Sequence, residues 1–473
     1  MLKRKISEVL MQWKTEGAKQ ALNIIGARQI GKSTAVREFG KSNYASFIEI
    51  NFIDDPQAVS IFQNTNGAEE ILVNITAYTH QEIIPHNTLI LLDEIQECPE
   101  ARTAIKFLVE DGRAHYVETG SLLGVRVQDI RSYPVGFERL VRMYPMDFEE
   151  FLWAVNMPVS VIDVVRECFE QRKPVADAIH IRFLKLFYLW MVVGGMPAVV
   201  DDYVHHQDIA RVSKLKQTIL DLYELDITKY ALPSQKLKIR EIFNAIPSQL
   251  DEKNRRFMFS KIDKGYRYRE LETSFLWLSE AGISLPCFNT NAPVSPLRLN
   301  EKRSLFKLYL CDTGLLCEMS ESPIEFALLQ GNVDINLGSI LENAFAQTLA
   351  SKLGGKELFY FDNKTMELDF LLQHGNSVDV LEIKSGNTWT AHPSLDKALA
   401  HVDWNIDRAF VFCKGNVEKK NNITYLPFYM SMFYDPLVTP KKTDLDLHSL
   451  LDELTPEYAS ALQAEKDAES HNK

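Results

Sequence analysis

The residues best suited to do chemistry form a glycine-rich stretch near the start of the chain. Residues 26–34 fit the phosphate-binding pattern G-x-x-x-x-G-K-[ST] at every position. In such a loop, successive backbone N–H groups point at phosphate oxygens, and the helix that follows adds positive potential. Lys32 is expected to reach the β- and γ-phosphates of ATP, and the Ser33 hydroxyl to hold Mg²⁺. The expected nucleotide-binding residues are Gly26, Ala27, Arg28, Gln29, Ile30, Gly31, Lys32, Ser33 and Thr34.

A pair of acids at the end of an apolar run is the second group of candidates. Asp93 and Glu94 directly follow residues 88–92, which have the composition of a buried strand. Asp93 is expected to hold Mg²⁺ through its water shell, and Glu94 to orient or deprotonate the attacking water. The alternative is an exposed acidic loop after a strand. The intact loop at residues 26–34 favours the catalytic interpretation.

Further polar residues follow in the same region. Thr119 or Ser121, on either side of Gly120, is expected to sense the γ-phosphate or the attacking water from the end of a strand. A simple turn at Gly120 is an equally good interpretation. Arg131 or Arg139 is expected to reach the nucleotide of a neighbouring copy and stabilise the transition state, which requires at least a dimer. The alternative is that these arginines are solvated surface residues.

The last part of the chain carries another set of acids with a lysine. Asp369, Glu382 and Lys384 have the spacing of a PD-(D/E)xK nuclease core, which this segment resembles. Glu382 and Lys384 project from one side of a strand, because strand side chains alternate. With Asp369 on the adjacent strand, two carboxylates would bind Mg²⁺, and Lys384 would position a water. Glu342 is expected to add a direct or more distant metal ligand. A nucleic-acid-binding remnant and a structural domain are the alternatives.

The elements that must position these residues alternate between strands and helices. Apolar runs predict strands at residues 21–25, 45–52, 88–94 and 115–119 with helices between them, which favours an α/β fold of the P-loop NTPase type. Helical periodicity then covers residues 146–230. The expected domains are a P-loop ATPase core with a parallel sheet (1–145), a helical lid (146–232), a winged-helix-like domain (233–325), a restriction-endonuclease-like, PD-(D/E)xK α/β domain (326–435) and a polar, partly disordered tail (436–473).

Several short phrases, taken in order, resemble a family of bacterial and archaeal AAA-type ATP-binding proteins that end in a domain of unknown function. The resemblance runs from about residue 20 to about residue 430. It implies an ATPase core of the AAA type and a winged helix in the middle of the chain. Beyond the glycine-rich loop, the phrases lie at residues 92–96, 119–121, 144–151, 193–197, 226–230, 246–250 and 308–315.

Composition restricts the partners and the compartment. The net charge of -12 argues against a chain built mainly to coat nucleic acid. Residues 236–269 are nevertheless locally basic and are expected to contact DNA, with a solvated face on a protein-binding or structural module as the alternative. Six scattered cysteines without a C-x-x-C pair indicate a reducing cytosol. The sequence shows no signal peptide and no membrane span, so we expect a cytoplasmic protein.

These observations favour a magnesium-dependent ATPase of the AAA type. We expect it to form a homo-oligomer and to couple ATP binding and hydrolysis to a DNA-related activity. Metal-dependent DNA cleavage by the C-terminal domain is one candidate for that activity. The alternative is an ATP-regulated DNA-binding or scaffold protein that changes partners on binding ATP and whose nuclease-like domain is inactive.

Overall fold

The computed structural model describes residues 2–65, 67–120, 136–252, 255–263, 267–320 and 338–437. Residues 1–436 belong to one compact unit. Within the described ranges, no helix has the length and apolar character that a bilayer crossing needs.

Within the described residues, five parallel strands form the first sheet, in the order β2-β3-β4-β1-β5. They are β1 (Ala21–Ile25), β2 (Ser46–Asn51), β3 (Thr88–Asp93), β4 (His115–Gly120) and β5 (Glu138–Arg142). The first four coincide with the expected strands. The sequence did not predict β5, because this partly exposed edge strand carries Glu138, Arg139 and Arg142 and lacks the apolar run of a buried strand.

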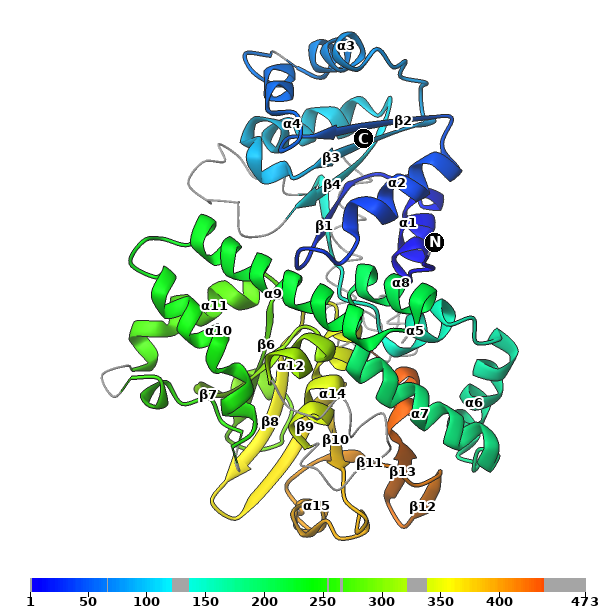
Figure 1. The fold of residues 1–473 in the computed structure, drawn as a ribbon, viewed down its shortest axis with the longest axis vertical. Helices are drawn as coiled ribbons and strands as arrows, with labels where there is room; N and C mark the ends of the chain where they lie inside the picture. The colour runs from blue at the N-terminus through cyan, green and yellow to red at the C-terminus, as the bar shows by residue number, and fades with distance from the viewer. Residues whose placement is uncertain are drawn as a thin grey trace, which may run out of the picture. The chain divides into compact units, whose positions relative to one another are not determined.

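Helices cover both faces of the first sheet (Figure 1). Leu89 and Leu91 of β3 pack in one core with α1 (Ile6–Thr15) and α2 (Lys32–Asn43). The alternate residues of the same strand, Ile90 and Leu92, pack in a second core. That second core includes residues of α3 (Ala68–Thr79), α4 (Pro99–Asp111) and the 3-10 turns η1 (Pro56–Ile61) and η2 (Ile95–Glu97). The fully apolar sequence of β3 follows from this burial on both faces.

A helical region follows the first sheet, as the sequence predicted. It contains α5 (Phe148–Ala154), α6 (Val159–Gln171), α7 (Asp177–Val193), α8 (Pro197–His206) and α9 (Ile209–Tyr230). At the start of α5, Asp147 and Glu150 form a capping box, in which each side chain accepts a hydrogen bond from the other residue's backbone N–H. Arg4 also pairs with Glu150 at 3.1 Å, so the N-terminal segment is tied to the first helix of this region.

Within its described residues, the segment in which a winged helix was expected contains three α-helices and a hairpin. They are α10 (Lys236–Leu250), the turn η4 (Phe259–Lys261), α11 (Tyr268–Glu280), β6 (Ser284–Thr290), the turn η5 (Leu297–Asn300) and β7 (Glu301–Leu310), followed by α12 (Thr313–Met319). The hairpin does not stand alone, because β6 also pairs in parallel with β8 (Leu358–Asn363). A single sheet therefore crosses the domain boundary that we expected at residue 325.

Over the described part of the chain, this second sheet has eight strands in the order β12-β13-β11-β10-β9-β8-β6-β7. Its remaining strands are β9 (Met366–His374), β10 (Ser377–Lys384), β11 (Ile406–Cys413), β12 (Glu418–Lys420) and β13 (Ile423–Pro427). The associated helical segments are α14 (Gly338–Leu353), α15 (Pro393–Leu399) and the 3-10 turn η6 (Phe428–Phe433). β9 and β10 run antiparallel, whereas β10 and β11 run parallel, so the sheet is mixed.

Candidate functional site

The glycine-rich loop joins the end of β1 to the start of α2, as the sequence predicted. Gly26 has a φ of +152°, and a Cβ there would lie only 2.2 Å from the carbonyl oxygen of Met143, so no other residue fits. Lys32 is buried at the first turn of α2, where its ammonium donates to the carbonyl oxygens of Gly26 (3.0 Å) and Ala27 (2.8 Å). Burial lowers the pKa of Lys32 from 10.5 to about 8.

Side chains from two strands and one helix converge on the Asp93 carboxylate at the end of β3. The Ser33 hydroxyl of α2 donates to Oδ1 of Asp93 at 2.7 Å, and the Thr119 hydroxyl of β4 donates to the same oxygen. The Asn51 amide of β2 donates to Oδ2 at 3.0 Å. β2, β3 and β4 are neighbours and run parallel, so their carboxyl ends meet at this edge. Open α/β sheets bind their ligands at such an edge.

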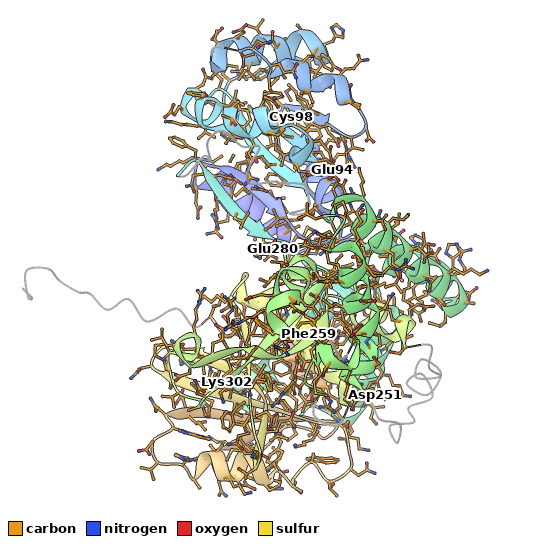
Figure 2. The ribbon with its side chains drawn as sticks, turned by 90° about the vertical axis from the view of Figure 1, so that its left-hand side faces the viewer. Glu94, Cys98, Asp251, Phe259, Glu280 and Lys302 are labelled. Carbon is orange, nitrogen blue, oxygen red and sulfur yellow. The ribbon has the colours of Figure 1, made fainter. Side chains whose placement is uncertain are left out.

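Glu94 lies just beyond the end of β3 in a left-handed backbone conformation, with φ 56° and ψ 47°. A residue other than glycine rarely adopts this conformation, and such backbone strain clusters at functional sites. The Gln96 amide donates to the Glu94 carboxylate at 2.5 Å. Figure 2 shows Glu94 where the first sheet meets the helices of the middle of the chain.

One face of α9 contacts the glycine-rich loop, and the sequence analysis did not assign these residues to the site. The Arg28 guanidinium donates to Asp226 at 2.7 Å and to the Tyr230 hydroxyl at 3.0 Å. The Tyr223 hydroxyl donates to the Arg28 carbonyl oxygen at 3.2 Å. Burial raises the pKa of the Asp226 carboxyl, and the nearby negative charge of Glu94 raises it further. The positive charges of Arg28 and Lys32 lower this pKa, but the net shift is upward. Residues 226–230 are one of the segments that carry the family resemblance, but nothing else in the sequence indicated that they lie at the site.

Two other segments enclose the loop. The Arg4 guanidinium, ahead of α1, donates to the Ile30 carbonyl oxygen at 2.8 Å. Gly282, in the turn between α11 and β6, packs so closely that a Cβ there would lie 2.8 Å from the Ala27 nitrogen. Figure 2 labels Glu280, at the end of α11, at this boundary with the first sheet. The loop therefore contacts the chain both before and after the helical region.

Three other residues were expected to contact the nucleotide of this chain or of a neighbouring copy. The structure describes only one of them, Arg139. Arg139 lies in β5 with an exposed side chain, 3.4 Å from Glu16 and in register with Leu22, so it does not lie at the carboxyl end of β1. Ser121 and Arg131 lie outside the described residues.

The structure brings Asp369, Glu382 and Lys384 together on the paired strands β9 and β10. Asp369 accepts a hydrogen bond from the Ile383 N–H at 2.8 Å, and Lys384 pairs with Oε2 of Glu382 at 2.8 Å. Within the described residues, Oε1 of Glu382 is buried without a hydrogen-bond partner. Burial, followed by the nearby Asp369, raises the pKa of Glu382 from 4.5 to about 8.

Glu342, the fourth expected acid of this domain, is bound by cationic and hydroxyl donors instead. Lys307, fully buried in β7, pairs with Glu342 at 3.3 Å and with Glu367 at 2.9 Å. Arg255 also pairs with Glu342, and the Tyr309 hydroxyl donates to it at 2.9 Å. Among the residues that the structure describes, no three His, Cys, Asp or Glu side chains converge as a metal site. A metal at Asp369 and Glu382 would therefore have two side-chain ligands.

Some basic side chains of residues 236–269 form ion pairs with acidic side chains of the same chain. Arg255 pairs with Glu342, and Arg256 pairs with Asp362 of β8 at 3.0 Å. Arg267 and Arg269 are exposed. The stretch therefore presents fewer cations to a nucleic acid than its composition indicates.

Comparison with family models finds a match over the first sheet. Residues 18–152 match the model of an AAA domain. Residues 184–324 and 337–430 match two models described as domains of unknown function, DUF8612 and DUF4143. No curated protein matches the chain.

Three similar solved structures come from different organisms. The Walker-type ATPase of Pyrococcus abyssi is 15% identical with a TM-score of 0.39, over 67% of this chain and 96% of that chain. The Orc1 protein of Aeropyrum pernix in complex with DNA is 13% identical with a TM-score of 0.27, over 70% and 95%. The RuvB Holliday junction branch migration motor of Thermotoga maritima is 12% identical with a TM-score of 0.28, over 60% and 89%. TM-scores this low carry no argument about the present chain.

Proposed function

We propose that the chain is a magnesium-dependent ATP hydrolase of the AAA type. The observation that carries this proposal is the meeting of Ser33, Thr119 and Asp93 beside the buried Lys32, at the carboxyl edge of the first sheet. A hydroxyl and a carboxylate oxygen form a donor set that suits Mg²⁺. The close approach of Gly26 to the Met143 carbonyl oxygen leaves no room for a side chain, which accounts for the first glycine of the pattern.

The residues of the chain divide the work of hydrolysis between them. Lys32 holds the β- and γ-phosphates, and Ser33 with Asp93 holds Mg²⁺. When bound, Mg²⁺ neutralises charge on the phosphate oxygens. Thr119 and Asn51 fix the orientation of the Asp93 carboxylate by donating to its two oxygens. Glu94 orients the attacking water and accepts its proton, and Gln96 fixes the Glu94 side chain.

Hydrolysis of ATP by the purified protein tests this proposal. The natural protein should release phosphate from ATP only with Mg²⁺ present. Glu94→Gln should keep ATP affinity and lose turnover, because the amide cannot accept the proton. Glu97→Gln, an acid three residues farther along in η2, is the matched control and should hydrolyse ATP normally. Equal turnover by the two variants would refute the role of Glu94.

We further propose that the nucleotide cycle controls a DNA-related activity of the second sheet. The contact of the loop with the turn before β6 supports a direct connection, because β6 is a strand of that sheet. Asp369 and Glu382 would hold a divalent metal, which polarises a scissile phosphate, and Lys384 would position a water. The unpartnered, buried Oε1 of Glu382 supports this choice, since it is an acceptor that a metal would satisfy.

A second candidate function follows from the Glu342 cluster. Lys307 and Arg255 already balance the charge of Glu342, which leaves a metal only two side-chain carboxylates. This favours an ATP-regulated DNA-binding or scaffold protein whose nuclease-like domain does not cleave. Under either candidate, a homo-oligomer is needed if Arg131 or Arg139 reaches the nucleotide of a neighbouring copy.

A cleavage assay separates the two candidates. Single- and double-stranded DNA would be incubated with Mg²⁺ or Mn²⁺, with and without ATP, using the natural protein and Lys384→Ala. An active nuclease should cleave in a metal-dependent manner and lose cleavage in Lys384→Ala. Absence of cleavage on every substrate, together with ATP-dependent DNA binding in a gel-shift assay, would establish the scaffold candidate instead.

A further inference from the structure

Arg28 is the residue of the glycine-rich loop whose side chain is held from outside the AAA domain. Its guanidinium donates from Nη1 to Asp226 and from Nη2 to the Tyr230 hydroxyl, both on α9. The Arg28 carbonyl oxygen accepts from Tyr223, a third residue of that helix. These helix residues are three and four positions apart and lie on one face. α9 therefore fixes both the backbone and the side chain of a residue in the phosphate-binding loop.

The Arg28 guanidinium retains unused capacity to bind an anion. Within the described residues, its Nε is buried and has no hydrogen-bond acceptor. A buried donor without an acceptor costs free energy that a phosphate oxygen would recover. Guanidinium donors match phosphate oxygens in geometry and bind them strongly.

The charges around the loop point to the same ligand. Arg28 and Lys32 are both cationic and lie four positions apart in the same loop. Two cations held near each other in a partly buried site favour an anion between them. Asp226, buried on α9, offsets the charge of Arg28 but leaves the Nε donor free.

We propose that Arg28 binds the terminal phosphate of the triphosphate and that Asp226 and Tyr230 of α9 are the positioning residues that hold it there. This inference rests on the proposed ATP site. It makes the helical region responsive to the presence of the γ-phosphate, because the residue that contacts this phosphate is tied to α9. It also gives the phrase at residues 226–230 a physical role.

The ratio of the ADP to the ATP dissociation constant tests the inference. If α9 had only a structural role, substitutions there would weaken the binding of ADP and ATP equally, and the ratio would not change. Titration calorimetry with Mg²⁺ would be performed in the Glu94→Gln background to prevent hydrolysis. Arg28→Ala should lower the preference for ATP about tenfold or more, the loss expected for one charged hydrogen bond. Asp226→Asn should lower it about fivefold, since a neutral amide restrains the guanidinium less. ADP affinity should change less than about threefold, which also shows that each variant is folded.

Two further variants and a control complete the experiment. Arg28→Lys keeps the positive charge but loses the paired donors, so it should lose most of the preference for ATP. Tyr230→Phe should lose less than Asp226→Asn, because it removes one neutral hydrogen bond. Thr228→Ala alters an exposed residue that donates only within α9, and it should behave as the natural protein.

The outcomes distinguish failure of the inference from failure of the ATP site. If the natural protein binds neither nucleotide, the proposed ATP hydrolase itself is wrong. If it binds ATP and the ADP-to-ATP ratio is unchanged in Arg28→Ala or Asp226→Asn, the inference is overturned. A higher preference for ATP in Asp226→Asn would also overturn it, because Asp226 would then compete with the phosphate for Arg28.

Discussion

Replacing Lys32 with methionine should make the nucleotide-free protein more stable while it abolishes ATP binding. Lys32 is buried, and burial is the main reason why its pKa falls from 10.5 to about 8. This fall corresponds to about 3 kcal/mol that the folded state loses by keeping the ammonium charged at pH 7. Methionine has a similar shape and no charge. The variant also loses two hydrogen bonds to loop carbonyls, about 1 kcal/mol each, which leaves a net gain of about 1 kcal/mol.

The gain should disappear as the pH rises. Below a pH of about 8, Lys32 carries its charge in both the folded and the unfolded chain, and the full cost is present. Between pH 8 and 10.5 the folded protein has released the proton and the unfolded chain retains it, so the natural protein gains stability relative to the variant. Above pH 10.5, Lys32 is neutral in both the folded and the unfolded chain. The remaining difference in stability is then the contribution of the two hydrogen bonds that the variant lacks.

Urea unfolding, followed by circular dichroism between pH 7 and 10.5, measures this difference. The protein would be kept in EDTA without nucleotide, and Lys41→Met, an exposed lysine of α2, is the matched control. Adding Mg-ATP should then raise the midpoint of the natural protein and the control but not of Lys32→Met. A variant that is less stable than the natural protein at pH 7, or whose difference is independent of pH, would refute the reasoning.

Three other changes test the packing around the site. Gly282→Ala should weaken ATP binding and cost about 1 to 3 kcal/mol of stability, because the added Cβ would press on the loop backbone and the residue has a φ of +74°. An unchanged ATP affinity by calorimetry and an unchanged urea midpoint would contradict this close contact. Glu118→Gln should become more stabilising as the pH rises above 4.5. Burial raises the pKa of the Glu118 carboxyl, so the folded natural protein retains a proton that the unfolded chain releases. An effect on the urea midpoint that does not depend on pH would contradict this prediction. Lys307→Met should cost about 3 kcal/mol, because the buried Glu342 carboxylate would keep only Arg255 and the Tyr309 hydroxyl as partners. Adding Glu342→Gln should recover part of that loss, and a double variant no more stable than the single one would show that the pairing is unimportant.

The local structure around the proposed nucleotide site was predictable from the sequence. The loop occupies nine consecutive residues between an apolar run and a helix, so its structure depends on neighbours in the chain. Asp93 and Glu94 follow a strand that is buried on both faces, which leaves a clear apolar signal. In the second sheet, period-two alternation placed Glu382 and Lys384 on one side of β10, and their 2.8 Å contact agrees with this.

The parts that depend on distant packing were not predictable. Arg28 and Asp226 lie 198 positions apart, and neither residue type indicates the other as its partner. The burial of Lys307 has no local signal, because lysines are rarely fully buried unless paired and its two partners come from other elements. The pairing of β6 with β8 joined two segments that composition separates into different domains. Pairing between distant strands depends on tertiary contacts, which no local pattern encodes.

Magnesium-dependent binding of ATP is the most direct test of the central claim. Titration calorimetry of the purified, folded protein with ATP or a non-hydrolysable analogue should show binding with Mg²⁺ and a large loss of affinity in EDTA. Ser33→Ala and Asp93→Asn should each lower the affinity for the magnesium complex, because both residues are proposed to be ligands of the ion. A folded protein that shows no magnesium-dependent affinity for either ligand would contradict the account.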